Sequence, residues 1–379
     1  MTALAITGLG VVSTVGIGHA AFVEALRSPC LLADLPEYPV ESFDATRCPS
    51  ARVAEVRGFD PKRYLGDKGH RSLDRLTKLL VVASKLALED AGIKKDGAFV
   101  ALSPERVGLF ASNAYGSLEA VAELDRVATL EDPRYVNPAK FPNTVHNSAA
   151  GYTSIWEDLR AFNVAVANGN TGALDAVVSA EIFLRAGRAD AVALGGMEAM
   201  SELLCAAFER LGTMRGAPWL GEGAAILVLE LPGATRVKRV LGHIVGAATA
   251  FVPSKGANVL MASSEALERA VRGALDDAGV SSVDLVASGL SGLGAYDDAE
   301  RKALCNVLGD RVTLAAPKAI FGETLGASGA FGIAAVLAWF EGAPVAPIVS
   351  GPAPDHVDTV LVTSLGYYAN ASAVVLRRA

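Results

Sequence analysis

The stretch 162–200 constrains the fold of this chain more than any other part of the sequence. It opens with a short apolar run, 162–167, which predicts a buried strand, and the turn-forming residues 168–172 follow. Residues 173–186 carry apolar side chains at helical spacing and predict a helix buried on more than one side. Residues 189–194 predict a second strand, which a turn at Gly195-Gly196 closes. This alternation favours an α/β fold.

Asn170 lies where the expected helix begins. A side chain in the first turn of a helix faces the positive end of the helix dipole. That position lowers the pKa of a thiol and stabilises developing negative charge, so it suits a nucleophile. An asparagine amide cannot be a nucleophile of this kind. The position therefore suits a nucleophile, but the residue that occupies it cannot act as one.

Composition limits the classes of function. The chain has 379 residues, 51% of them hydrophobic, and 38 glycines, which suits two fused α/β halves with many turns. A net charge of −7 without a long basic run argues against nucleic-acid binding. The four cysteines and five histidines show no metal-ligand spacing, so we expect neither a metal nor a cofactor.

The N-terminus is apolar but lacks the basic region of a signal peptide. No segment reaches the roughly 18 consecutive apolar residues that indicate a membrane span. We therefore expect a cytoplasmic protein with reduced cysteines.

Strands and helices alternate through two successive parts of the chain, which predicts a duplicated α/β unit. Pro232-Gly233 resembles a hinge, so we expect halves at 1–235 and 236–379, with a surface excursion at about 28–61. The main expected helices are 19–26, 71–91, 264–278, one from Asp297 and one ending near Trp339. The main expected strands are 4–7 (closed by a turn at 8–10), 107–111, 224–231, 240–245, 285–287 and 313–315.

Eight segments, in order, resemble the β-ketoacyl-ACP synthases, the condensing enzymes of the thiolase superfamily. The resemblance covers nearly the whole chain and implies the thiolase fold, in which two duplicated α/β halves form an αβαβα layered core. The segments are ITGLGVVSTVG, RSLDRLTKLLVVASKLALEDAG, FPNTVHNSAAGYTSI, GRADAVALGGMEAM, LGEGAAILVLE, DLVASGLSGLGAYDDAE, PKAIFGETLGASGA and SLGYYANASAVVLRR.

The same resemblance implies that all three catalytic positions have changed. In the family, a cysteine takes the acyl chain as a thioester, and two histidines stabilise the enolate formed when malonyl-ACP loses CO2. Counted from the neighbouring motifs, the cysteine position falls at Asn170 and the histidine positions at Gly289 and Glu323. An amide cannot capture an acyl group, glycine has no side chain, and an anionic glutamate has the wrong charge for an enolate.

Other family positions are retained or altered. Lys318 is in place, and Glu300 matches a family acid that resembles an ion-pair partner for that lysine. Tyr367 and Tyr368 stand where a phenylalanine gate would be, and the segment 213–220 is shorter than the family's loop. Both changes lie around the implied acyl entrance.

The remaining candidate residues favour structural roles. Cys205 and Cys305 are expected to be buried small side chains, and His146 a hydrogen-bonded loop histidine rather than a functional one. Glu222 is expected to bind backbone N–H groups near the altered site.

These changes are typical of the chain-length factors, ketosynthase-like subunits without the cysteine. We therefore expect a non-catalytic subunit that pairs with an active β-ketoacyl synthase and shapes the tunnel for a growing polyketide, polyene or fatty-acid chain. Acyl carrier protein would be reached through that partner, with residues 163–167 near the dyad. One alternative is a repurposed enzyme that hydrolyses or decarboxylates acyl thioesters with Glu323 and Asn170. Another is a carrier-binding or scaffold module without a ketosynthase partner.

Overall fold

The computed structural model describes residues 3–36, 39–49, 52–211, 219–233, 239–253 and 261–379. Its centre is an 11-stranded sheet with the order β13-β12-β11-β14-β15-β10-β1-β9-β7-β5-β6. These strands are β1 (Leu4–Val12), β5 (Val107–Ser112), β6 (Asn163–Val166), β7 (Ala191–Glu198), β9 (Gly223–Glu230), β10 (Gly242–Phe251), β11 (Leu285–Ala287), β12 (Leu314–Ala315), β13 (Ile348–Ser350), β14 (Thr359–Leu365) and β15 (Asn370–Arg377).

Two short pairs lie outside this sheet: β2 (Arg52–Ala54) with β8 (Trp219–Gly221), and β3 (Lys94–Lys95) with β4 (Ala98–Phe99). The helices are α1 (His19–Arg27), α2 (Lys62–Leu65), α3 (Arg75–Asp90), α4 (Leu118–Arg126), α5 (Ser148–Glu157), α6 (Gly172–Arg185), α7 (Glu202–Arg210), α8 (Ser264–Ala278), α9 (Gly294–Leu308), α10 (Lys318–Phe321) and α11 (Ser328–Phe340). No helix among the described residues is both long and apolar enough to cross a membrane.

The sheet repeats one strand pattern on either side of its centre. β1 and β10 pair antiparallel at the middle. Outward from β1, β9 and β7 follow antiparallel, then β5 and β6 parallel. Outward from β10, β15 and β14 follow antiparallel, then β11 and β12 parallel. The prediction of a duplicated α/β unit is therefore confirmed by the topology.

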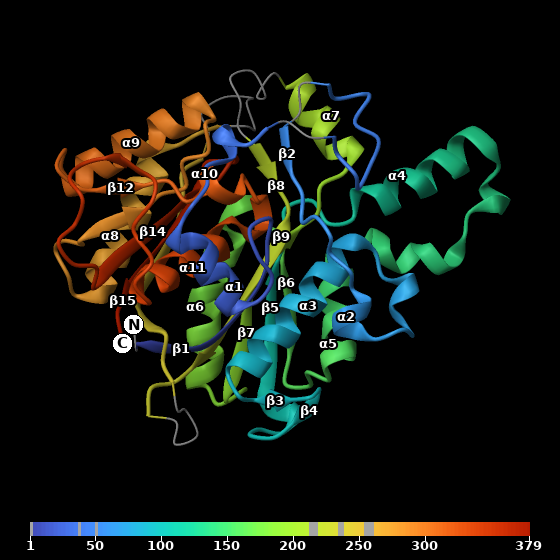
Figure 1. Cartoon of the computed structure of the whole chain (residues 1–379), viewed down its shortest axis with the longest axis horizontal. Helices are drawn as coiled ribbons and strands as arrows, with labels where there is room; N and C mark the ends of the chain where they lie inside the picture. Colours follow the sequence, from blue (N-terminus) through green and yellow to red (C-terminus); the bar gives the residue numbers. More distant parts are fainter. Residues whose placement is uncertain (1–2, 37–38, 50–51, 212–218, 234–238, 254–260) are drawn as a thin grey trace.

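Helices form three layers around the two half-sheets (Figure 1). α3 and α5 pack together, and α3 contacts β1, β7 and β9. α8 and α9 pack together, and α8 contacts β10, β14 and β15. Between them α6 and α11 contact each other and strands of both halves, and nearly all of α11 is buried. A helix buried all round needs an apolar sequence, which SGAFGIAAVLAWF provides. This arrangement matches the expected αβαβα layering.

Two glycine pairs belong to strands, so the predicted turns were wrong. β1 runs on through residues 8–10, and β7 through Gly195 and Gly196. A Cβ at Gly8 would lie 2.5 Å from the Ala87 carbonyl oxygen of α3. These glycines allow close packing of neighbouring backbones onto the strand rather than a change of direction.

Three further element predictions needed correction. β6 is the last strand of its edge and is half-exposed, so the prediction of a buried strand was wrong. α3 begins at Arg75 rather than at 71, because the Asp74 side chain accepts a hydrogen bond from the Thr77 N–H and caps the helix. The excursion 28–61 is partly structured, since buried β2 pairs with β8.

Candidate vacated active site

Asn170 lies in a single 3-10 turn between β6 and α6, the expected start of the helix. Its Nδ2 donates to the Leu365 carbonyl oxygen at 2.7 Å, and the Ser364 hydroxyl donates to the Asn170 carbonyl oxygen at 2.8 Å. The Oδ1 atom is buried and meets no hydrogen-bond donor among the described residues. The side chain therefore ties the start of α6 to the end of β14.

Gly289 follows β11 in the C-terminal half. Its N–H donates to Glu300 Oε1 at 2.8 Å, and the Thr363 hydroxyl donates to the same oxygen at 2.6 Å. A Cβ at Gly289 would lie 3.1 Å from Glu300 Oε2. Burial raises the pKa of Glu300, although the Thr363 and Gly289 hydrogen bonds oppose the shift. An imidazole at this position would meet the Glu300 carboxyl group.

Glu323 forms a buried ion pair. Lys318 Nζ donates to its Oε2 at 2.6 Å, while its Oε1 accepts from the Leu325 N–H at 2.8 Å and from the Ser328 hydroxyl. Lys318 thus forms its close ion pair with Glu323, while its charge also acts on the Glu300 carboxyl group and opposes the rise in the pKa of Glu300. Both oxygens of Glu323 are occupied, and its charge is balanced.

Glu198 at the end of β7 was missed by the sequence analysis. Its Oε2 accepts from the N–H of Ala114 at 2.8 Å and of Gly326 at 3.1 Å. Burial raises the pKa of Glu198 to about 8, while these N–H groups oppose the shift and the charge of Glu323 adds to it. The available signal was a carboxylate directly after a fully apolar strand with two glycines.

Tyr367 and Tyr368 take different positions. The Tyr367 ring is buried and packs edge-on against Tyr296, with centroids 5.0 Å apart, and against Phe208 at 6.4 Å. Its hydroxyl is close enough to Glu323 for the carboxylate to raise its pKa, in addition to burial, but makes no hydrogen bond of good geometry with the described residues. Tyr368 is exposed at the surface.

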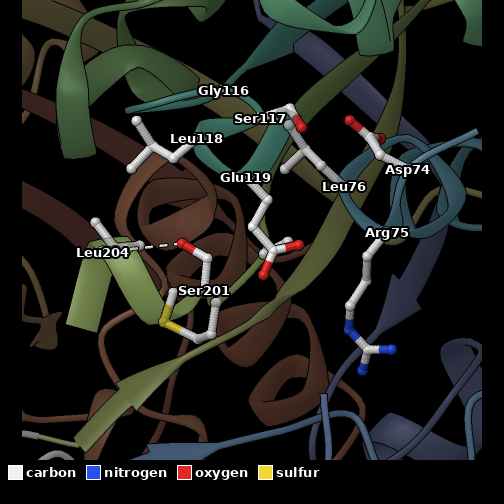
Figure 2. Close-up of a pocket in the computed structure, with 11 residues that line it drawn as sticks. Asp74, Arg75, Leu76, Gly116, Ser117, Leu118, Glu119, Ser201 and Leu204 are labelled. Atoms are coloured by element: carbon white, nitrogen blue, oxygen red, sulfur yellow. Dashed lines mark hydrogen bonds between the residues drawn. The ribbon is translucent and has the colours of Figure 1, made fainter. Parts of the chain in front are cut away.

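Glu222 holds the strands next to this site. It accepts from the N–H of Val56 at 2.9 Å and of Met200 at 3.4 Å, as expected, and from the Arg75 guanidinium. Beside this ion pair lies a pocket of ≈ 30 Å³, into which Glu119 and Ser201 project (Figure 2). Its volume suits water rather than an acyl chain.

The remaining candidates fall outside this cluster. His146 is exposed, and its Nδ1 lies 3.1 Å from Asn113 Oδ1, which fits a loop histidine. Cys205 is buried as expected, but Cys305 is exposed on α9, so that expectation was wrong. Residues 212–218, most of the shortened segment 213–220, lie outside the described residues. No group of three or more His, Cys, Asp or Glu in the described part of the chain is arranged to hold a metal ion.

Comparison with known proteins identifies the family. The profile for the β-ketoacyl synthase N-terminal domain matches residues 1–231, and that for the C-terminal domain matches 241–351. The chain belongs to the β-ketoacyl synthase family.

Two curated relatives match almost the full length. The 3-oxoacyl-[acyl-carrier-protein] synthase 2 of Coxiella burnetii is 27% identical, over 98% of this chain and 98% of its own. The actinorhodin polyketide putative beta-ketoacyl synthase 2 of Streptomyces coelicolor is 28% identical, also over 98% of each chain. A chain of the ishigamide ketosynthase/chain length factor structure superposes with a TM-score of 0.87 over 100% of this chain and 99% of its own, at 22% identity. That likeness shows the shared fold.

Proposed function

We propose that this protein is a non-catalytic, chain-length-factor-type subunit that pairs with a cysteine-containing β-ketoacyl synthase in type II chain elongation. The observation that carries the proposal is the state of Asn170, Gly289 and Glu323. None of the three is a thiol or an imidazole, and each is bound into the scaffold. Carrier protein would deliver its chain to the partner's active site.

The edge of the N-terminal half-sheet supports pairing with a second subunit. β6 ends the sheet, so one side of the strand has no neighbouring strand among the described residues. A free strand edge is a template for pairing with another chain. Ile155 on α5 and Ile182 on α6, the two helices that contact β6, expose their side chains. Exposed apolar groups beside an unpaired edge favour an interface.

Residues 117–147, called the arm, carry a second group of exposed apolar side chains. Figure 1 shows α4 and the turns after it projecting from the body of the molecule. Leu130, Tyr135 and Phe141 expose large apolar side chains on the arm, with Phe141 64% exposed. An arm of this kind gains stability when a partner covers it, because apolar surface leaves water.

Co-expression with each cysteine-containing β-ketoacyl synthase of the source organism tests the pairing. We expect a heterodimer on size-exclusion chromatography, and we expect Phe141→Glu to lower recovery of the complex at least about tenfold, the effect of an interface hot spot. Val100→Glu is the matched control, because Val100 is 61% exposed but lies outside the arm and the edge. A monomer or homodimer in the presence of the ketosynthase would contradict the proposal.

The hydrogen bonding of Glu323 argues against the repurposed enzyme. A general base must reach the substrate, whereas Glu323 is 2% exposed and both of its oxygens accept hydrogen bonds from the scaffold. Turnover of malonyl-ACP by the isolated protein, abolished by Glu323→Gln, would overturn this view. Capture of carrier protein by this chain without a ketosynthase would instead favour the carrier-binding module.

A further inference from the structure

Three aromatic side chains from separate elements pack together beside Glu323. Phe208 comes from α7, Tyr296 from α9, and Tyr367 from the turn between β14 and β15. Tyr367 packs edge-on against both of the others. We call these three residues the aromatic plug.

Exposure rises outward through the plug. Glu323, at the bottom, is 2% exposed, and Tyr367, whose hydroxyl lies near it, is 7% exposed. Tyr296 is half-buried, and Tyr368 is 38% exposed. Tyr367 therefore stands between the Lys318–Glu323 pair and the partly exposed tyrosines.

The plug is fixed by both packing and hydrogen bonds. Tyr367 belongs to a buried apolar cluster that includes Met200, Leu204 and Leu325. Its backbone carbonyl accepts from the Met261 N–H at 2.8 Å, and the Gly366 N–H donates to the Asn370 carbonyl at 2.7 Å. The turn that carries Tyr367 is thus held at both sides, and the ring can leave the site only if this packing opens.

We infer that the aromatic plug, and not only the loss of the cysteine, keeps thioester substrates out of this subunit. The inference rests on the proposed function, because exclusion keeps the growing chain on the partner's cysteine. Restoring a thiol with Asn170→Cys would then not restore acyl capture. In that reaction the introduced thiolate would attack the thioester carbonyl, a new C–S bond would form, and the pantetheine thiolate would leave and take up a proton.

Site-resolved mass spectrometry tests the inference on the full chain carrying Asn170→Cys. The probes are iodoacetamide and hexanoyl-pantetheine, and the exposed Cys305 is the internal reference. A thiol sealed by packing reacts only through local opening, so we expect modification at position 170 to be at least about tenfold slower than at Cys305. Equal rates at the two positions would overturn the inference.

Opening the plug should reverse this protection. Adding Tyr296→Ala and Tyr367→Ala to Asn170→Cys is expected to raise the rate at position 170 at least about tenfold. Adding Val100→Ala, which shortens an exposed side chain outside the arm and the sheet edge, should leave the rate unchanged. If the combined variant does not fold, Tyr296→Ala alone replaces it in the test, because this substitution removes only a half-buried ring. No gain of reactivity in a folded plug variant would sink the inference.

Loss of the heterodimer and loss of the plug are separate outcomes. Chromatography with the ketosynthase reports pairing, and labelling of the Asn170→Cys variant reports closure. A chain that fails to pair but protects the introduced thiol would contradict the proposed function and leave the plug intact. A chain that pairs but exposes the introduced thiol would agree with the proposed function and contradict the aromatic plug.

Discussion

Glu323 stands where the family resemblance implies an imidazole, and its charge is balanced by Lys318 rather than used. Both side chains are almost fully buried. Burying two charges costs desolvation energy, which close contact and additional hydrogen bonds offset. The pair is therefore worth little compared with apolar replacements, but breaking it leaves a buried charge alone.

Removing one charge of the Lys318–Glu323 pair should destabilise the protein more than removing both. Lys318→Met leaves the Glu323 carboxylate unpaired, and we expect the free energy of unfolding to fall by about 3–5 kcal/mol. The double variant Lys318→Met/Glu323→Gln removes both charges and should recover most of that loss. The exposed pair Lys140–Glu123 is the control, since Lys140→Met should cost about 1 kcal/mol or less. Urea unfolding measures all three, and equal losses in the single and double variants would contradict the assignment.

At the scale of single elements, the glycines of β1 set the distance between strand and helix. A Cβ at Gly10 would overlap the Ala83 carbonyl oxygen of α3, and one at Gly8 would crowd Ala87. α3 thus lies directly on the strand backbone, and any side chain at either position must push it away. The layer spacing depends on these two residues.

Substitution at Gly10 tests this packing. Gly10→Ala should destabilise the protein by about 1–3 kcal/mol or more, because the helix has no room to shift. Gly151→Ala is the matched control: Gly151 lies within α5, its Cβ would meet no atom within 4 Å, and alanine is the better helix former by about 1 kcal/mol. Thermal unfolding measures both effects. A Gly10→Ala variant as stable as the unmodified protein would mean that α3 can shift away from β1.

At the scale of the whole molecule, a charged cluster joins α1 and α3 to the end of α11. His19 Nδ1 lies 3.0 Å from Asp90 Oδ2, and His19 Nε2 lies 2.7 Å from Glu341 Oε1. Arg239 lies in the connection between the halves, and its guanidinium group is 3.3 Å from Asp90 Oδ2. Burial lowers the pKa of His19, but the Asp90 hydrogen bond and the charges of Asp90 and Glu341 outweigh both burial and Arg239, and raise it.

This cluster should make stability depend on pH. A histidine whose pKa is raised by folding contributes stability that is fully present below its unfolded pKa of about 6.5. That contribution is lost as the pH rises through the folded pKa. His19→Gln should therefore destabilise the protein more at about pH 6 than at about pH 9. Urea unfolding at the two pH values measures the loss, and an equal loss from His19→Gln at both would contradict the prediction.

The periodicity of apolar residues and the local chemistry of the sequence predicted many elements of the fold. Residues 264–278 form a helix with the predicted bounds, and 285–287 form the predicted strand. Such elements are predictable because each apolar stripe must face a core. β6 was assigned wrongly, because an apolar run does not reveal whether a strand lies inside a sheet or at its edge. The assignment of Asn170, Gly289 and Glu323 to the three catalytic positions remains a prediction.

The sequence alone determined which chemical groups this protein has at the start of α6 and in the loops facing it: an amide, a glycine and a glutamate in a family scaffold. Only the tertiary structure decided what those groups do. It paired Lys318 with Glu323, placed the Glu300 carboxyl group beside Gly289, and packed the Tyr367 ring against Tyr296 and Phe208. The physical reason is that pairing and closure depend on which distant segments meet in space. Asn170 and Leu365, 195 residues apart, carry no local signal of their meeting.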